Sequence, residues 1–248
     1  MNLPTPAVLA AVEGLYVAFA VYPLPDWTGP CLHCHSADEE RQLHESPLRK
    51  LSAEQLRAYA GDALLVWGDE PIFKHFLPRL AEIFVTASQP SLELQDPEIL
   101  LSKFRHGNWL TWPPEEQAAT RAFLLALWRA VLAGPPPIDE HWLDMESWLC
   151  SIAQAEDDLN PYLQVWLAEM DGMAGVALGQ FICDSGVAHR QETGRNPYWK
   201  DREAPYKQVR AWIRSEAVLM KLMEAEARIS EAEGKGQVQA ALSELGVD

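Results

Sequence analysis

Apolar residues recur at helical spacing from one end of the chain to the other, and this pattern constrains the fold more than any other feature of the sequence. No stretch shows the sustained alternation of β-branched residues that is typical of half-buried strands. The chain is therefore predicted to be all-α, with about nine or ten helices joined by short loops. Helices are expected over residues 7–22, 52–67, 69–84, 96–106, 114–133, 142–152, 160–166, 173–185 and 205–230, with a weak one after residue 236.

Two of these helices are joined by signals that predict their pairing. Ser52 opens the first helix and Gly68 ends it. Asp69 can cap the next helix, which has Pro71 in its first turn and Pro78 as an expected kink. A two-residue connection predicts an αα-hairpin. We therefore expect stacked hairpins in an α-solenoid-like arrangement, with a closed helical bundle as the alternative, although no strict sequence repeat is visible.

The length of 248 residues fits one large domain or two small ones. We predict a single all-α domain over residues 1–248, with a soft boundary at the Gly-Pro-Pro-Pro run of residues 134–137. A chain of this length buries about 70–75% of its unfolded surface, so its stability requires no disulfide or metal.

Charge narrows the choice of partners. The chain has 20 Lys and Arg residues against 36 Asp and Glu residues, a net charge of −16, so nucleic-acid binding is not expected. Residues 190–228 are the exception, because nine basic residues meet only six acidic ones there. This segment predicts a basic face for an acidic protein partner, with Arg195, Arg202 and Arg210 as contacts. The alternative is a solvated helix whose charges pair along its own surface, and the oligomeric state is not readable.

The first apolar run, residues 7–22, raises the question of a signal peptide or a membrane span. No basic residue precedes Arg41, and Glu13 lies inside the run. The run is also shorter than the ~20 residues that cross a bilayer. We therefore expect a mostly buried first helix, no membrane partner, a cytoplasmic location and reduced thiols.

The one motif that carries chemistry is Cys31-Leu32-His33-Cys34-His35. Two thiols at this spacing can bind one metal ion, because the turn between them directs both sulfur atoms to a common point. Structural zinc takes four Cys or His ligands, and a second Cys pair is missing. The four ligands of the predicted zinc site would therefore be Cys31, Cys34 and histidines drawn from His33, His35 and His44, with His75 reachable after folding.

Three other interpretations of the same residues stay open. The motif matches the signature for attaching a c-type haem, although that attachment takes place outside the cytoplasm. Cys31 and Cys34 could also form a dithiol–disulfide couple, which usually occurs in a βαβ setting. The remaining alternative is a pair of cysteines that serves packing only.

Signature motifs of enzymes are missing. The sequence has no H-E-x-x-H, no G-x-S-x-G, no P-loop and no G-x-G-x-x-G. The preferred interpretation is a helical binding or adaptor module with a zinc site and a protein partner. The alternative is a metal-dependent enzyme, or a thiol redox protein that uses Cys31 and Cys34.

Residues 28–85 carry a family resemblance. Pro30-Cys31 and Cys34 are followed by Pro47-Leu48-Arg49, by Trp67-Gly68-Asp69 and by Phe73-Lys74-His75-Phe76-Leu77-Pro78-Arg79. This pattern resembles a bacterial protein family to which no function is assigned. The resemblance implies a bacterial cytosolic protein in which the cysteine loop leads into a helical hairpin, and it implies no activity.

Overall fold

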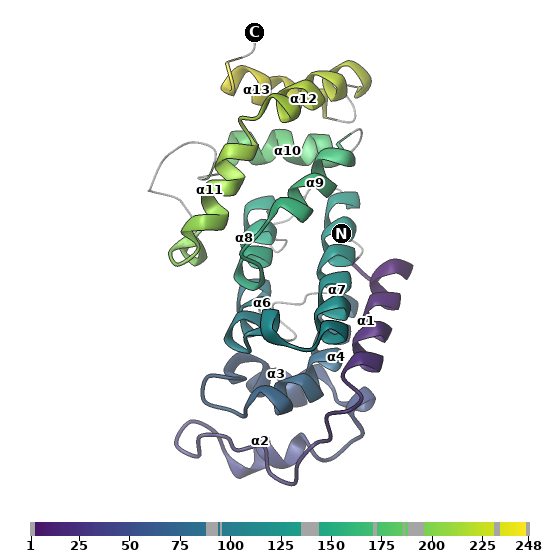
Figure 1. Ribbon diagram of the computed structural model, residues 1–248, viewed down its shortest axis with the longest axis vertical. Helices are drawn as coiled ribbons and strands as arrows, with labels where there is room; N and C mark the ends of the chain where they lie inside the picture. Colours follow the sequence, from purple (N-terminus) through teal and green to yellow (C-terminus); the bar gives the residue numbers. More distant parts are fainter. Residues whose placement is uncertain are drawn as a thin grey trace. The chain divides into compact units, whose positions relative to one another are not determined.

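The computed structural model describes residues 3–87, 94, 96–134, 144–170, 173–185, 187, 196–230 and 234–246. These residues form α-helices and short 3-10 helices, and they contain no strand beyond two isolated backbone bridges (Figure 1). The prediction of an all-α fold is confirmed. No helix within the described ranges combines the length and the apolar composition that a bilayer crossing needs.

The described part of the chain has twelve α-helices, more than the nine or ten expected. They are α1 (Pro6–Ala18), α2 (Ala37–Gln42), α3 (Ala53–Asp62), α4 (Glu70–Thr86), α6 (Pro97–His106), α7 (Pro114–Ala133), α8 (Met145–Ala155), α9 (Asn160–Ala168), α10 (Met173–Asp184), α11 (Glu203–Trp212), α12 (Glu216–Arg228) and α13 (Lys235–Glu244). The 3-10 helices are η1 (Leu48–Lys50), η2 (Trp109–Thr111) and η3 (Pro197–Trp199).

Side-chain caps fix where α3 and α4 begin. Ser52 Oγ accepts the N–H of Gln55 at the start of α3. Asp69 Oδ1 accepts the N–H of Ile72 at the start of α4. Both starts agree with the sequence prediction, because a capping side chain acts within one turn of helix. Pro78 lies inside α4, as expected.

The connection between α3 and α4 is longer than the predicted two residues. α3 ends at Asp62 rather than at Trp67, because Asp62 O accepts three N–H groups in succession, those of residues 65–67. Leu64 adopts the left-handed conformation in this turn, with φ of +65°. α3 therefore ends five residues before the predicted end, and the chain turns back toward α4.

The helix predicted over residues 205–230 is two helices. α11 ends at Trp212, and Ser215 caps α12 by accepting the N–H of Val218. A further short helix, α2, occupies a polar stretch that reads as loop in the sequence, and a capping box at Ser36 starts it. These two local caps account for much of the difference in helix number.

The chain divides into two compact units, Leu3–Leu127 and Trp128–Asp248, which we call the N-terminal and C-terminal units. The division falls within α7. Of the predicted boundary at 134–137, only Gly134 is among the described residues. The prediction of a single domain stays a prediction.

The N-terminal unit packs its helices around aromatic side chains. The ring of Phe73 on α4 stands edge-on to that of Phe104 on α6, with centroids 6.0 Å apart. Tyr59 on α3 packs on Phe76 of α4 at 4.6 Å and edge-on to Trp67 at 5.7 Å. These contacts hold the turn between α3 and α4 against the core.

A cluster of buried charges lies in the same unit. Lys74 Nζ is 2.7 Å from Glu70 Oε1 and 2.8 Å from Glu116 Oε2. The hydroxyl of Tyr22 donates to Glu116 Oε1 at 2.6 Å. Burial by itself lowers the pKa of Lys74, but the hydrogen bonds from Lys74 to the two carboxylates outweigh it and raise that pKa. The lysine is therefore charged although its side chain is buried.

The C-terminal unit is built on tryptophan. Trp166 of α9 is fully buried, and its ring centroid lies 5.3–5.5 Å from those of Trp128, Trp212 and Phe181. Its indole Nε1 donates to Ala174 O. Trp128 and Trp212 are buried as well.

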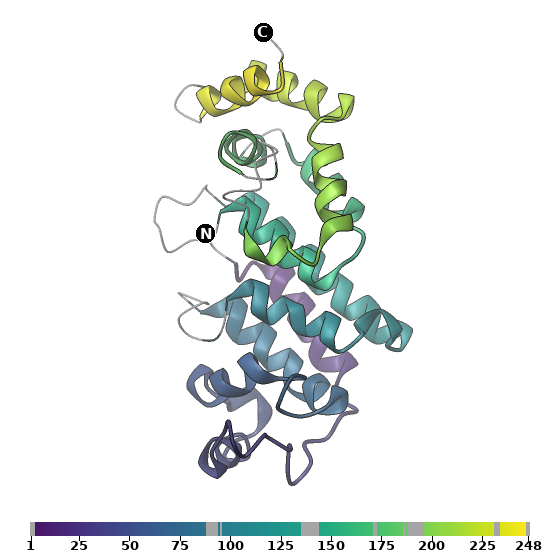
Figure 2. The same cartoon turned by 90° about the vertical axis from the view of Figure 1, so that its left-hand side faces the viewer.

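A small residue lets α13 lie directly against α10 in the C-terminal unit (Figure 2). A Cβ atom on Gly179 would lie 2.7 Å from Gln237 O and 3.0 Å from Val238 N. The backbone of α13 thus occupies the space that any larger residue at this position would need.

Candidate functional site

The two cysteines of the sequence motif lie on a tight turn of the N-terminal unit, just before α2. The N–H groups of Cys34 and His35 both donate to Cys31 O at 2.9 Å. Cys31 N–H donates to Val66 O at 2.9 Å, and Pro30 forms an isolated bridge with Trp67. The turn is therefore closed within itself and is also attached to the connection between α3 and α4.

The two thiols of this turn influence each other's pKa. Hydrogen bonds from the backbone N–H of His33 and from the thiol and backbone N–H of Cys34 hold the pKa of Cys31 below its ordinary value. Because the Cys34 thiol donates to Cys31, the pKa of Cys34 is raised. Cys34 is exposed and Cys31 is partly exposed. The two thiols thus differ in acidity, with Cys31 more acidic and Cys34 less acidic than an ordinary cysteine.

The imidazole of His35 lies between two carboxylates. Its Nε2 is 3.0 Å from Asp62 Oδ2 and its Nδ1 is 3.8 Å from Glu39 Oε2. The imidazole also packs on the ring of Trp67, with centroids 4.5 Å apart. His35 therefore anchors the cysteine turn to the end of α3.

His44 is likewise paired with a carboxylate. Its Nε2 lies 3.0 Å from Oε1 of Glu40, which is buried and also accepts the N–H of Thr28 at 2.7 Å. The Thr28 hydroxyl donates to Glu40 and accepts the indole N–H of Trp67. Burial raises the pKa of Glu40, but the hydrogen bonds from Thr28 outweigh it and the pKa is lowered.

The predicted metal ligands are thus close in sequence but not gathered around one point. Cys31 and Cys34 are together, His33 is exposed, and His35 and His44 are each paired with a different carboxylate. The imidazole of His75 is within 2.8 Å of Tyr22 O. Among the residues that the structure describes, no three His, Cys, Asp or Glu side chains are grouped to hold a metal ion. The zinc site stays a prediction.

Two residues near the turn carry chemistry that the sequence did not indicate. Asp62 comes from the end of α3 and meets His35 across 27 positions of chain, for which no local pattern exists. Lys103 on α6 is buried, and its Nζ donates to Gly61 O at 2.5 Å. Burial lowers the pKa of Lys103 to about 8. One sequence signal could have indicated this burial: Lys103 lies three residues after Leu100 and therefore on the apolar side of α6.

The predicted partner-binding arginines have different environments. Arg202 is buried, and its guanidinium donates to the carbonyl oxygens of Ala153 and Glu156 and to Asp157. Arg210 is partly exposed and lies over the ring of Tyr206 at 5.9 Å. Arg195 lies outside the described residues. Of the two described arginines, only Arg210 therefore offers its charge to a partner.

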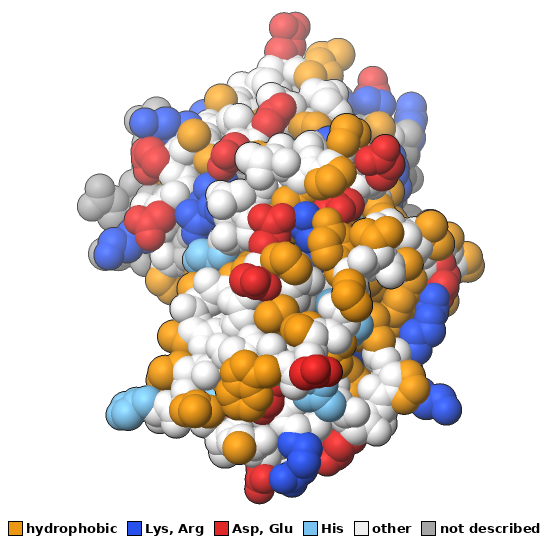
Figure 3. All heavy atoms as spheres, turned by 60° about the horizontal axis from the view of Figure 1, so that its bottom comes forward, with side chains coloured by type: hydrophobic (Ala, Val, Ile, Leu, Met, Phe, Trp, Pro, Cys, Tyr) orange, Lys and Arg blue, Asp and Glu red, His pale blue; other side chains and the backbone are white. Residues whose placement is uncertain are grey.

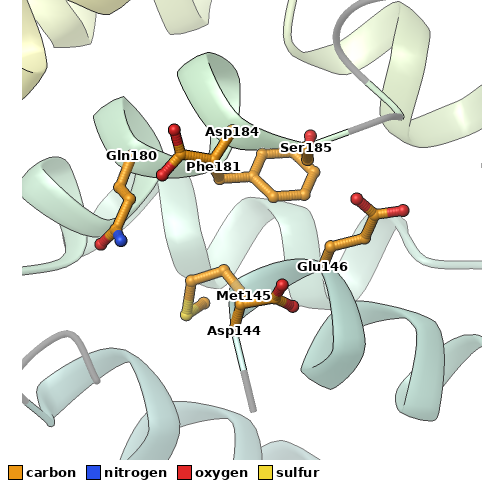
Figure 4. Close-up of a pocket in the computed structure, with 7 residues that line it drawn as sticks. All are labelled: Asp144, Met145, Glu146, Gln180, Phe181, Asp184 and Ser185. Carbon is orange, nitrogen blue, oxygen red and sulfur yellow. The ribbon is translucent and has the colours of Figure 1, made fainter. Parts of the chain in front are cut away.

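The C-terminal unit has a pocket of about 210 Å³ between the start of α8 and the end of α10 (Figure 4). The described residues that line it include three carboxylates and no Lys, Arg or His, so a ligand there would be uncharged or cationic. The lining residues are Asp144, Met145, Glu146, Gln180, Phe181, Asp184 and Ser185. Asp144 also caps α8 by accepting the N–H of Ser147.

Comparison of the chain with protein-family models, with curated proteins and with solved structures gives no match. The candidate site therefore has to be judged on its own geometry. Of the features described, the cysteine turn is the one in which two reactive groups lie on one tight turn and both reach the surface.

Proposed function

We propose that this protein is a thiol–disulfide exchange protein in which Cys31 and Cys34 form a dithiol–disulfide couple. The observation that carries the proposal is the tight turn at the surface of the N-terminal unit, in which the N–H groups of Cys34 and His35 bond to Cys31 O and both cysteines are at least partly exposed. A turn closed in this way holds the Cα atoms of its first and fourth residues within about 7 Å, which is close to the separation that a disulfide spans. The lowered pKa of Cys31 supports this cysteine as the attacking sulfur.

The exchange follows from these positions. The Cys31 thiolate attacks one sulfur of a substrate disulfide, forms a mixed disulfide and releases the other substrate sulfur as a thiolate, which takes up a proton. Cys34 then loses its proton and attacks Cys31 Sγ, which releases the second substrate thiol. The substrate gains two electrons and two protons, and the protein is left with a Cys31–Cys34 disulfide. In a reducing cytoplasm, such a disulfide would be transient.

Zinc is the second candidate for the same turn. A lowered pKa at Cys31 favours the thiolate form, which is the form that attacks a disulfide and also the form that binds a metal. Zn²⁺ would take Cys31 and Cys34 as two of four tetrahedral ligands and histidines of the loop as the others. Two of those histidines would first have to leave their carboxylate partners.

The helical scaffold is proposed to act as a binding module around this chemistry. Its hairpins would stack in an α-solenoid-like arrangement in the cytoplasm, and Arg210, with Arg195, would meet an acidic protein partner. The partly exposed guanidinium of Arg210 supports this role. Arg210→Glu should then weaken capture of such a partner, and an unchanged set of partners would remove the proposal.

A trapping experiment tests the exchange function directly. The tag-free Cys34→Ser protein should accumulate a mixed disulfide at Cys31 when treated with 4,4′-dithiodipyridine, because the resolving thiol is gone. The wild-type protein should instead release two thiopyridone molecules and lose two hydrogen atoms in its intact mass. Cys183→Ser is the matched control, since Cys183 lies in the C-terminal unit and should not change the outcome. Stoichiometric zinc by elemental analysis, with thiols that do not react, would favour the metal site.

A further inference from the structure

Exposed apolar side chains occur in the cysteine turn and in the segment that the Cys31–Val66 hydrogen bond attaches to it. Trp27, Leu32, Leu65 and Val66, which we call the apolar rim, have between 40% and 66% of their surface exposed. Leu32 lies between the two cysteines, and Val66 O accepts the N–H of Cys31. Figure 3 brings forward the part of the N-terminal unit that carries α2, where hydrophobic side chains lie beside carboxylates and histidines.

The backbone conformation of residues 62–67 fixes the exposure of Leu65 and Val66. Leu64 holds a left-handed conformation, which is unfavourable for a residue with a Cβ. The N–H groups of residues 65–67 all bond to Asp62 O, which fixes the turn with Leu65 and Val66 on the outside. Strain of this kind gathers at functional sites, and grouped apolar surface marks a place where another molecule binds.

The charges near the turn limit what that molecule is. Glu39 and Asp62 lie against His35, and Asp38 follows in the first turn of α2. Arg41, on the same helix, is paired with Asp38 at 2.7 Å. A small anionic disulfide such as that of glutathione meets repulsion here and gains little from the rim. A peptide without acidic flanks gains both apolar contact and a neutral or favourable field.

We infer that the substrate of the Cys31–Cys34 couple is a polypeptide disulfide whose cysteine is flanked by apolar residues, which lie on the rim formed by Trp27, Leu32, Leu65 and Val66. This inference rests on the proposed function. It adds the class of substrate and a binding surface for it. The electrons pass as in the exchange above, so the polypeptide disulfide is reduced to two thiols and the protein becomes the disulfide.

The experiment uses the reduced full-length protein and three disulfides. Two are peptides of equal length that carry one cysteine as a mixed disulfide with 2-mercaptoethanol, one with Leu, Val and Phe around the cysteine and one with Asp and Glu. The third is glutathione disulfide. Reaction with the apolar peptide should be faster than with the other two by about tenfold or more, because part-burial of two apolar side chains contributes that much.

Variants of the apolar rim test whether it causes the faster reaction with the apolar peptide. In Leu65→Ser/Val66→Ser the ratio of the apolar-peptide rate to the acidic-peptide rate should fall toward one. Val17→Ser is the matched control, because Val17 is exposed to a similar or greater degree on α1 of the same unit and should keep the ratio. Equal rates for all three disulfides in the wild type, or an unchanged ratio in the double variant, would overturn the inference while leaving the exchange function in place. No reaction with 4,4′-dithiodipyridine either would instead overturn the exchange function.

Discussion

The two units use the same secondary structure and differ in how much charge they bury. The C-terminal unit fills its interior with tryptophan rings around Trp166 and brings α10 against α13 through Gly179. Among the described residues, Arg202 is the buried cation of the C-terminal unit, whereas the N-terminal unit buries more charged groups within its aromatic core, among them Lys74, Lys103 and Glu40. Each of these groups is tied to a carboxylate, a carbonyl or a loop residue.

The difference shows what buried charge does in a helical fold. Apolar contact is nondirectional, whereas a buried charge is tolerated only where partners with defined geometry meet it. In the N-terminal unit those partners are often on loops. Glu40 accepts the N–H of Thr28, and the Thr28 hydroxyl accepts the indole N–H of Trp67. The unit can thereby hold an irregular segment, the cysteine turn, against its helices. Four predictions test this comparison, beginning with the largest effect.

Lys74→Met should lower the free energy of unfolding by about 3–5 kcal/mol, because it leaves Glu116 buried without its cation. Urea denaturation measures the loss. Lys74→Met/Glu116→Leu should recover much of it, since no charge is then left buried. The control is Arg129→Met in the C-terminal unit, whose ion pair with Glu169 is exposed and should change stability by about 0.5 kcal/mol or less. Equal effects at Lys74 and Arg129 would contradict the comparison.

Stability should rise with pH above about 8 because of Lys103. The pKa of Lys103 is about 8 in the folded protein and near 10.5 in the unfolded protein. Below pH 8 the lysine is protonated in both states, so the folded protein bears the full cost of burying its charge. Between pH 8 and 10.5 the unfolded state binds more protons, and the free energy of unfolding rises by up to about 3 kcal/mol.

Lys103→Met is the reference for this pH effect. This variant has no titrating group at position 103. The difference in free energy of unfolding between the two proteins therefore reports Lys103 alone and not the tyrosines that ionise in the same pH range. Urea unfolding at pH 7, 8, 9 and 9.5 measures the difference. Parallel stability curves for the two proteins would show that Lys103 is not held in a desolvated site.

Gly179→Ala should destabilise the C-terminal unit by about 1–3 kcal/mol, because the added Cβ would lie 2.7 Å from the backbone oxygen of Gln237. Gly236→Ala is the matched control within α13. It meets no atom within 4 Å and should be neutral or stabilising by about 0.5–1 kcal/mol. Thermal unfolding of the two variants measures both effects, and a neutral Gly179→Ala would mean that α10 and α13 are not in close contact.

Ser36→Ala should have the smallest effect, about 1 kcal/mol, because it removes the capping box of α2 directly after the cysteine turn. Hydrogen exchange should increase at the amide of Glu39, which bonds to Ser36 Oγ. Ser36→Thr keeps the cap and should protect that amide as the wild type does. Unchanged exchange in Ser36→Ala would show that α2 does not depend on its cap.

Sequence reasoning succeeded where the signal is local. Ser52 and Asp69 cap their helices from positions within one turn, so the starts of α3 and α4 were readable. It failed where distant groups decide the outcome. The end of α3 depends on a left-handed Leu64 and on the packing of Trp67 against Tyr59, which no local spacing encodes.

The same distinction applies to the candidate site. Cys31 and Cys34 were readable because their spacing alone closes a turn. Their contacts with Val66 and, through His35, with Asp62 come from a segment about thirty residues later in the chain. The pairing of His35 and His44 with carboxylates depends on that fold as well, so the ligand set of a metal site could not be derived from the motif alone.

The most direct test of the central claim is a redox titration of the tag-free full-length protein against dithiothreitol buffers, with free thiols trapped by a maleimide and counted by mass spectrometry. The account predicts that Cys31 and Cys34 become protected together in one two-electron transition, which is lost in Cys31→Ser and kept in Cys183→Ser. Two thiols that stay free under every buffer, or that are protected by bound zinc rather than by a disulfide, would contradict it.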